Sequence, residues 1–340
     1  MNDQESDDKV DLEELFDSSV EHEPTPMGER VRRTADLTLV APARVALTDW
    51  RAVVGTLILF GFFLAGTAGV VLVDRPTSGD APILAPPFQN LNYILGTDTF
   101  GQPIGAQLIH ATPAMFKMIF AGAVVSIGVA ALVGLLSGFM RGTVVDTVLM
   151  SVTDIVITIP GLPLVIVLMA IFAPKNPYVV GVLLGLDNWP GLARTVRSQV
   201  LSIRQESYVE ASRIMGLSTG TILRRDLLGQ LMPYITINSA LASRRIIFES
   251  VGLYFLGILP FTTFNWGVLM NLAYKGGALN RPQMLHWLIF PMVTIFLMSF
   301  GLVLFSQGMD SVFNVRLRAR HASTTSDNSA MDQGQGDGDV

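Results

Sequence analysis

The chain has 340 residues, of which 50% are hydrophobic and 15% are charged, and it contains no cysteine. Soluble domains carry about a quarter charged residues, so this composition favours a membrane protein, and the absence of cysteine excludes disulfide scaffolds, thiol catalysis and cysteine-based metal sites. The formal net charge of -5 conceals an asymmetry, because ten of the 28 acidic residues lie between Asp3 and Glu23 and four lie between Asp327 and Asp339.

The two ends of the chain are predicted to be disordered tails. Residues 1–26 are acidic and poor in aliphatic side chains, and residues 322–340 are mostly Ser, Asp, Gly and Gln. Such stretches do not bury enough apolar surface to offset the entropy lost on ordering. We therefore expect a largely disordered acidic segment over residues 1–50 and a disordered tail over residues 319–340.

Residues 51–318 hold six apolar stretches that predict about six transmembrane helices. A spanning helix needs about 20 mainly apolar residues. The clearest stretch runs from Ala52 to Val73 without a charge, and the third is interrupted by Pro160. The predicted spans are 52–73, 113–140, 144–172, 178–193, 231–259 and 286–309. The sequence thus predicts an all-α integral membrane protein.

The distribution of Lys and Arg predicts the orientation. With six spans both termini lie on one side, and the segments on that side then hold fifteen arginines, against four Lys and Arg residues on the other. Because positive residues accumulate in cytoplasmic loops, both termini are expected in the cytoplasm of a multi-pass protein of the cell membrane.

The long inner loop, residues 194–230, is predicted to form two short helices separated by a glycine. Helical spacing relates Tyr208, Ala211, Ile214 and Met215, which form an apolar stripe. Gly216 then breaks the pattern, and a second short run follows through Ile222 and Leu223. A basic helix–Gly–helix element on the cytoplasmic side suits a docking surface better than a catalytic pocket. The same pattern is also compatible with an ordinary pair of surface helices.

Several motifs in this order resemble the permeases of binding-protein-dependent ABC importers. The stretch Tyr208-Val-Glu-Ala-Ser-Arg-Ile-Met-Gly216 is similar to the Glu-Ala-Ala…Gly signature of that family. Further stretches resemble the dipeptide, oligopeptide and nickel permeases, namely Gly96-Thr-Asp98 with Gly101, Val145 to Pro160, Trp189 to Arg197, and Glu249 with Phe255-Leu-Gly257 and Trp266-Gly267. The Gly-Thr-Asp motif points to the second of the two paired permeases in such systems.

The resemblance implies a set of partners. A permease of this family forms the translocation path with a second permease, receives solute from an extracellular binding protein, and is driven by two cytoplasmic ATPase subunits. ATP and Mg would be bound by those partners, so the chain itself is expected to bind no cofactor, to catalyse no reaction and to contact lipid but not nucleic acid. It has no Gly-x-x-x-x-Gly-Lys-Ser/Thr loop for nucleotide phosphates. The expected solute is a dipeptide or oligopeptide.

By the same resemblance, a coupling helix in the inner loop would insert into a groove of one ATPase. The residues expected to couple to the ATPase are Glu210, Ala211, Ser212, Gly216 and Leu217. The chain departs from the family pattern in three places. Ser212 and Gly229 replace the usual Ala and Pro, and Gln102-Pro103 replaces an Arg-Asp pair after Gly101, which leaves the role of the outer motif and the solute less defined.

Three charged residues fall inside the predicted fifth span, namely Arg244, Arg245 and Glu249. An Arg facing lipid near the bilayer centre costs about 2.5–3.5 kcal/mol. Arg245 and Glu249 are four residues apart and are expected to pair on one helix face. Either this face lines the translocation path and meets carboxylates of the solute, or the charges form a structural ion pair, or the helix lies deeper toward the cytoplasm.

Other motifs favour packing over chemistry. Asp146 and Asp154 lack the Gly-x-Gly-Asp context of intramembrane aspartyl proteases, and the histidines have no metal-binding spacing, so no catalytic or metal site is expected. The two Gly-x-x-x-Gly pairs, at residues 134–138 and 181–185, predict close helix contacts. The alternatives to an importer permease are an ATPase-independent secondary transporter or channel and a membrane-anchored receptor or scaffold. The former predicts internal repeats and the latter an ordered soluble domain, and the sequence shows neither.

Overall fold

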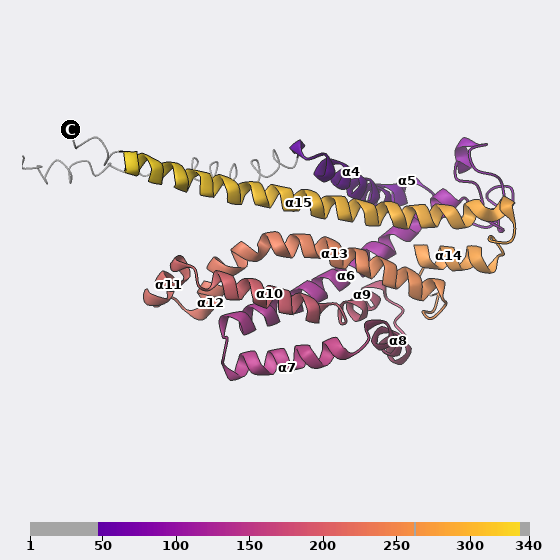
Figure 1. Ribbon diagram of the computed structural model, residues 1–340. Helices are drawn as coiled ribbons and strands as arrows, with labels where there is room; N and C mark the ends of the chain where they lie inside the picture. Colours follow the sequence, from indigo (N-terminus) through magenta and orange to yellow (C-terminus); the bar gives the residue numbers. More distant parts are fainter. Residues whose placement is uncertain (1–46, 262, 334–340) are drawn as a thin grey trace, which may run out of the picture. The chain divides into compact units, whose positions relative to one another are not determined.

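The computed structural model describes residues 47–261 and 263–333, and these residues form helices and no β-strand (Figure 1). The acidic stretch between residues 1 and 46, predicted to be disordered, lies outside the described residues. The α-helices are α4 (Trp50–Leu64), α5 (Val70–Leu72), α6 (Ile104–Phe139), α7 (Val144–Thr158), α8 (Gly161–Phe172), α9 (Pro177–Gly185), α10 (Trp189–Ile203), α11 (Ser207–Ile214), α12 (Thr219–Ile222), α13 (Leu228–Phe255), α14 (Trp266–Lys275) and α15 (Leu285–Gln333). The short helices are η2 (Ala65–Gly69), η3 (Leu91–Tyr93), η4 (Leu223–Leu227) and η5 (Pro282–Met284).

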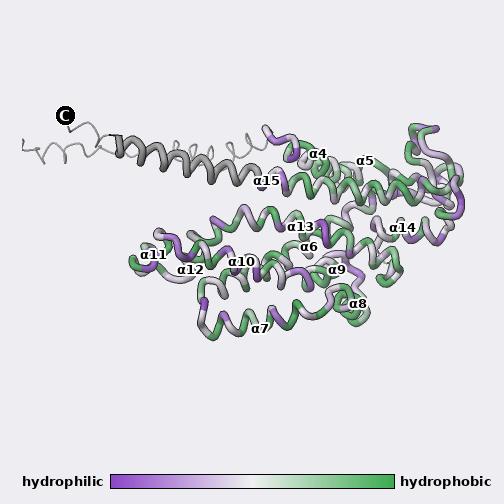
Figure 2. The backbone as a smooth tube through the Cα atoms, in the orientation of Figure 1, coloured by the Kyte–Doolittle hydropathy of each residue, from purple (hydrophilic) through white to green (hydrophobic). Residues whose placement is uncertain are grey.

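Three helices of the described chain are long and apolar enough to cross a membrane, Trp50–Leu72, Ile104–Phe139 and Pro282–Asp310. The pair α7 and α8 counts as a fourth span if its 89° bend is included. The bend falls at Ile159-Pro160, where the proline lacks the N–H that would continue the helix. Figure 2 shows hydrophobic residues along α4, α8 and the coloured part of α15.

The helix boundaries differ from the predicted spans in several places. The predicted fourth span, 178–193, is not one helix, because α9 ends at Gly185 and Pro190 lies in the first turn of a new amphipathic helix, α10. The fifth span corresponds to α13, whose three charged residues keep it outside the apolar set. The second begins nine residues earlier than predicted, with Pro113 tolerated inside α6. The last helix continues to Gln333, through most of the predicted tail.

Helix α6 is the central packing element and lies against α9, α10 and α13. Both predicted Gly-x-x-x-Gly pairs make close contacts inside the chain. A Cβ at Gly181 would overlap the Met118 carbonyl, one at Gly185 would lie 2.6 Å from the Gly122 oxygen, and one at Gly134 would lie 2.7 Å from the Ala193 oxygen. The prediction that these glycines pack helices within the subunit is therefore confirmed.

The outer connection between α5 and α6 is folded around the Gly-Thr-Asp motif. Thr97 and Asp98 are buried. The Asp98 carboxylate accepts hydrogen bonds from the backbone N–H groups of Phe100 and Gln102 at 2.8 and 2.9 Å, and from the Gln107 amide at 2.8 Å. The Thr97 carbonyl also lies 3.0 Å from His286 Nε2 at the start of α15. The motif thus joins the outer connection to two long helices.

Candidate functional site: a projecting helix in the inner loop

The inner loop forms the helix–Gly–helix element that the sequence predicts. Helix α11 ends at Gly216, whose φ of +75° is a left-handed conformation that suits glycine. The Gly216 N–H donates to the Arg213 carbonyl at 3.0 Å, and the Leu217 N–H donates to the Ser212 carbonyl at 3.2 Å. These two bonds are the Schellman pattern, so the helix end is closed by its own backbone. Ser218 then caps α12 through the Thr221 N–H.

An apolar cluster holds α11 against the rest of the chain. Val209 is fully buried and Ser212 is nearly so. Val209 packs in a cluster that spans α10, η4 and α13, made of Val196, Val200, Val209, Ile222, Leu227 and Leu231. Because this cluster joins the inner loop to the two helices that flank it, α11 is anchored on one face only.

The opposite face of α11 is exposed and partly apolar. Ile214 is 81% exposed and Met215 is 70% exposed, and Tyr208, Glu210 and Ala211 are exposed as well. The predicted apolar stripe therefore points outward, whereas Val209 and Ser212, which the stripe does not include, face the core. Large apolar residues that a rigid, capped helix presents to solvent are typical of a docking surface.

The residues expected to couple to an ATPase lie together on α11 and its cap. Glu210 and Ala211 are exposed on the helix, and Gly216 and Leu217 form the exposed end. Ser212 differs from the others because its side chain is buried, so it contributes to anchoring. A Cβ at Gly216 would meet no atom within 4 Å, which shows that the backbone angle, and not crowding, favours glycine there.

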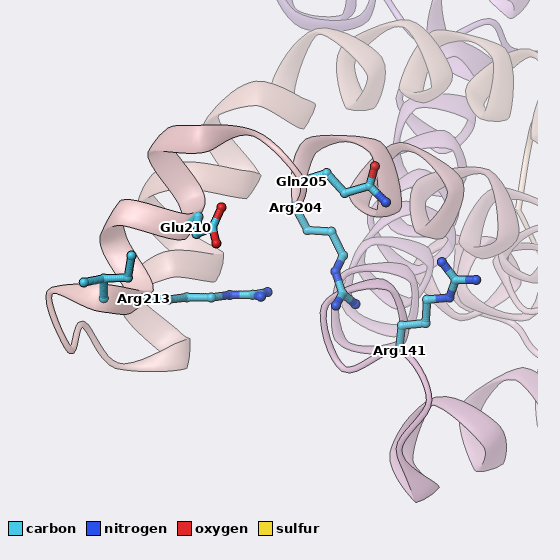
Figure 3. A pocket seen from close by; sticks show the side chains of 6 residues that line it. Arg141, Arg204, Gln205, Glu210 and Arg213 are labelled. Atoms are coloured by element: carbon cyan, nitrogen blue, oxygen red, sulfur yellow. The ribbon is translucent and has the colours of Figure 1, made fainter.

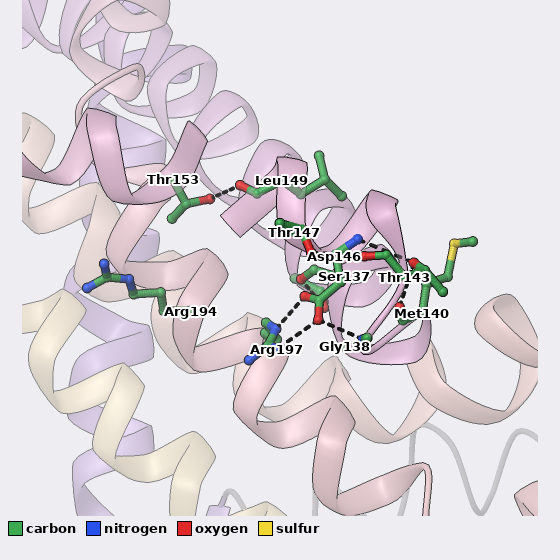
Figure 4. A network of polar contacts seen from close by, with 12 residues as sticks. Ser137, Gly138, Met140, Thr143, Asp146, Thr147, Leu149, Thr153, Arg194 and Arg197 are labelled. Atoms are coloured by element: carbon green, nitrogen blue, oxygen red, sulfur yellow. Dashed lines mark hydrogen bonds and ion pairs between the residues drawn. The ribbon is translucent and has the colours of Figure 1, made fainter. Parts of the chain in front are cut away.

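Two ion pairs join α10, which leads into the inner loop, to α7. Arg197 donates to both carboxylate oxygens of Asp146 at 2.9 and 3.0 Å (Figure 4). Arg194 pairs with Asp154. Asp146 is buried and also accepts from the Gly142 N–H at 3.1 Å, whereas Asp154 is exposed. Asp146 therefore pairs with Arg197, 51 positions further along the chain.

The charged residues predicted inside the fifth span form part of a larger cluster. Arg245 Nε donates to Glu249 Oε1 at 2.6 Å, which confirms the predicted pairing four residues apart, and Arg245 also pairs with Asp187 at 3.1 Å. The Asp187 side chain is 2% exposed, whereas that of Arg245 is 54% exposed. Arg244 is exposed and makes no ion pair with the described acidic residues.

Sequence reasoning missed Asp187, which lies between α9 and α10. The signal available was the interruption of an apolar run by Asp187-Asn188. A Cβ at Gly161 would overlap Asp187 Oδ2, so the start of α8 also packs against this carboxylate. The cluster thus holds the bent pair α7–α8, the α9–α10 junction and α13 together.

The comparisons with known proteins identify the family. Residues 130–319 match the model of the binding-protein-dependent transport system inner membrane component. The chain belongs to that family. The matched residues include α10 to α13, so the projecting helix and both ion-pair groups lie in the family domain.

Individual relatives extend the match to the outer connection. The oligopeptide transport system permease protein OppC of Bacillus subtilis is 26% identical over 262 residues, covering 76% of this chain and 80% of the relative. The nickel transport system permease protein NikC of Escherichia coli K12 is 28% identical over 233 residues, covering 67% and 81%. A structure of the MetNI methionine ABC transporter in an inward-facing conformation aligns with a TM-score of 0.47 and 20% identity, covering 60% of this chain and 96% of that chain. This permease is thus a multi-pass membrane component related to ABC importers of the peptide and nickel group.

Proposed function

We propose that this permease forms a translocation path for dipeptides or oligopeptides together with a second permease, and that α11 docks into one of two cytoplasmic ATPase subunits. The observation that carries the proposal is the exposed face of α11, because Ile214 and Met215 present apolar surface on a helix that the buried Val209 side anchors. ATP and Mg are bound by the ATPases, and a solute-binding protein delivers the solute outside. Both termini lie in the cytoplasm.

The residues of α11 have distinct roles in this proposal. Glu210 supplies a charge on the docking face, where it pairs with a basic group of the ATPase. Ala211 allows the backbone of α11 to approach that of the ATPase closely. Gly216 and Leu217 follow the end of α11, so the helix is short enough to fit the groove of the ATPase. The relative named for oligopeptide transport supports a peptide solute. The relative named for nickel transport shows that similar chains belong to systems with a different solute.

The test is a charge reversal on the docking face. We expect Glu210→Arg to reduce copurification of the ATPases, or to leave their ATP hydrolysis no longer stimulated by solute, because the reversed charge repels the basic partner. The matched control is Asp74→Arg, the same charge change at an exposed residue of the outer connection. The measurement is subunit stoichiometry and ATPase activity of the purified complex. A chain that purifies alone and transports without ATP would overturn the proposal in favour of a secondary transporter.

The exposed side of α13 supplies the solute path in this proposal. Arg244 and Arg245 lie on it, with the largely buried Glu249 paired to Arg245, and Arg244 is an exposed charge that the described residues leave without an ion pair. An uncompensated charge inside a membrane is costly, and a path through which charged solutes pass explains its retention.

Two alanine variants separate the path role from a structural role. Arg244→Ala is expected to lower solute uptake severalfold while the complex assembles normally, because no described ion pair is lost. Arg245→Ala is expected to impair assembly itself, since it leaves the carboxylates of Asp187 and Glu249 unpaired. Uptake is measured in vesicles and assembly by size-exclusion chromatography. Normal uptake by an assembled Arg244→Ala complex would remove the path role.

A further inference from the structure

Three arginines line a cavity beside α11, and the proposed function gives these arginines no role, although Glu210 and Ile214 of the docking face also contribute to the lining. The cavity has a volume of about 600 Å³ and is lined by Arg141, Arg204, Gln205, Glu210, Arg213 and Ile214 (Figure 3). The lining comes from three segments: the turn between α6 and α7, the end of α10, and α11. Three guanidinium groups and one carboxylate leave the lining with an excess of positive charge.

Two of the three arginines, Arg204 and Arg213, are held in place by neutral groups. Arg204 donates to the carbonyl oxygens of Gly138 and Phe139, both at 3.1 Å, at the C-terminal end of α6. The guanidinium of Arg213 lies 4.6 Å from the centre of the Phe139 ring. Among the described residues, neither Arg141 nor Arg213 makes an ion pair. No ion pair within the described residues therefore neutralises the guanidinium groups of Arg141 and Arg213.

The arginines also repel one another. Burial lowers the pKa of the Arg204 guanidinium, and the charges of Arg213 and Arg141 lower it further. Like charges held this close are unfavourable unless an anion joins them. Binding of a negatively charged group in the cavity would therefore be favourable, because it would reduce the repulsion between the arginines.

The cavity lies beside the end of a helix that is long and apolar enough to span a membrane. Arg141 follows directly on the end of α6, one of the apolar helices long enough to span a membrane. The next helix, α7, begins with exposed apolar residues, among them Val144 at 79% exposure and Val148. Basic pockets at the cytoplasmic ends of spanning helices bind the head groups of anionic lipids, and apolar residues beside them accommodate acyl chains.

We propose that this cavity binds the phosphate group of an anionic phospholipid of the cytoplasmic leaflet. The proposal rests on the orientation given under the proposed function. A bound phosphate bridges Arg141 at the end of a span, Arg204 at the end of α10 and Arg213 on the docking helix. The lipid then holds α11 at a fixed height relative to the membrane surface.

The test measures lipid binding directly on the purified complex. Short-chain phosphatidylglycerol is titrated into the complex in neutral detergent, and the rise in thermal unfolding midpoint reports binding. We expect wild type to be stabilised by phosphatidylglycerol and not by short-chain phosphatidylcholine. In Arg141→Gln the half-saturating concentration should rise about fivefold, and it should rise further in the double variant with Arg213→Gln, because each arginine contributes separately.

A matched variant and a soluble probe complete the design. Arg224→Gln removes an exposed arginine of the same loop that does not line the cavity, and it should bind as wild type does. Equal binding by wild type and the double variant would overturn the site. If inorganic phosphate stabilises wild type as well as phosphatidylglycerol does, the phosphate site stands and the lipid as its source is overturned. The readout needs neither ATP nor solute, so it is independent of the Glu210→Arg result.

Discussion

The outer Gly-Thr-Asp turn and the inner helix α11 are both short motifs, but they differ in how their polar groups are used. In the outer turn, Thr97 and Asp98 are buried, and the Asp98 carboxylate accepts three hydrogen bonds from within the chain. In α11, Glu210 and Ala211 face solvent, and the apolar residues beside them do the same. One motif is complete within the subunit and the other presents its surface outward.

The difference separates a motif that serves folding from one that we propose serves docking. It also explains why the departure at residues 102 and 103 leaves the outer turn intact. Asp98 uses the backbone N–H of Gln102, so the turn does not depend on the identity of that side chain. Pro103 directly precedes α6, where its fixed φ is compatible with the start of a helix.

The largest difference in stability is expected between two variants, each of which removes the acidic side chain of one motif. Asp98→Ala leaves two backbone N–H groups and the Gln107 amide without their acceptor, and should destabilise the permease by about 3 kcal/mol. Glu210→Ala, at an exposed position, should change stability by less than about 0.5 kcal/mol. Thermal unfolding of the two purified variants checks the comparison. Equal losses of stability would show that α11 is as much a structural element as the outer turn.

A smaller effect is expected at the glycines with positive φ. A Cβ at Gly101 would overlap the Ala81 carbonyl, and φ there is +70°, so Gly101→Ala should cost about 2 kcal/mol. Gly216→Ala meets open space and should cost about 1 kcal/mol, from the backbone angle alone. Thermal unfolding again measures both, with Gly220→Ala as a control in open space without a positive φ. A larger loss at Gly216 than at Gly101 would contradict the distinction.

The sequence predicted the elements whose causes are local. Pro160 lies at the bend between α7 and α8, and Gly216 ends α11 through its own backbone geometry. The pairing of Arg245 with Glu249 also follows from spacing along one helix. The sequence therefore predicted the two short helices of the inner loop and the glycine that separates them. The coupling roles of their residues stay a prediction.

The sequence could not predict the features that depend on distant contacts. The partner of Asp146 is Arg197, 51 positions away in the chain, and spacing along the sequence gives no signal for such a distant pair. Asp187, between α9 and α10, meets Arg245 of α13, and a contact between segments this far apart cannot be read from the apolar window that contains Asp187. The outward direction of the α11 stripe was likewise unpredictable, because amphipathic spacing does not tell which face is buried.

The π-helical turn η4 sets the angle at which α13 leaves the inner loop. It closes through the Leu228 N–H, which donates to the Leu223 carbonyl, and so holds one residue more than an α-helical turn. Because each helical residue advances about 100°, deleting one residue here would restore regular α-helix and rotate α12 by that angle. Ile222 would then leave the apolar cluster. We therefore expect substitutions of the exposed Arg224 to be tolerated where single-residue deletions in η4 are not.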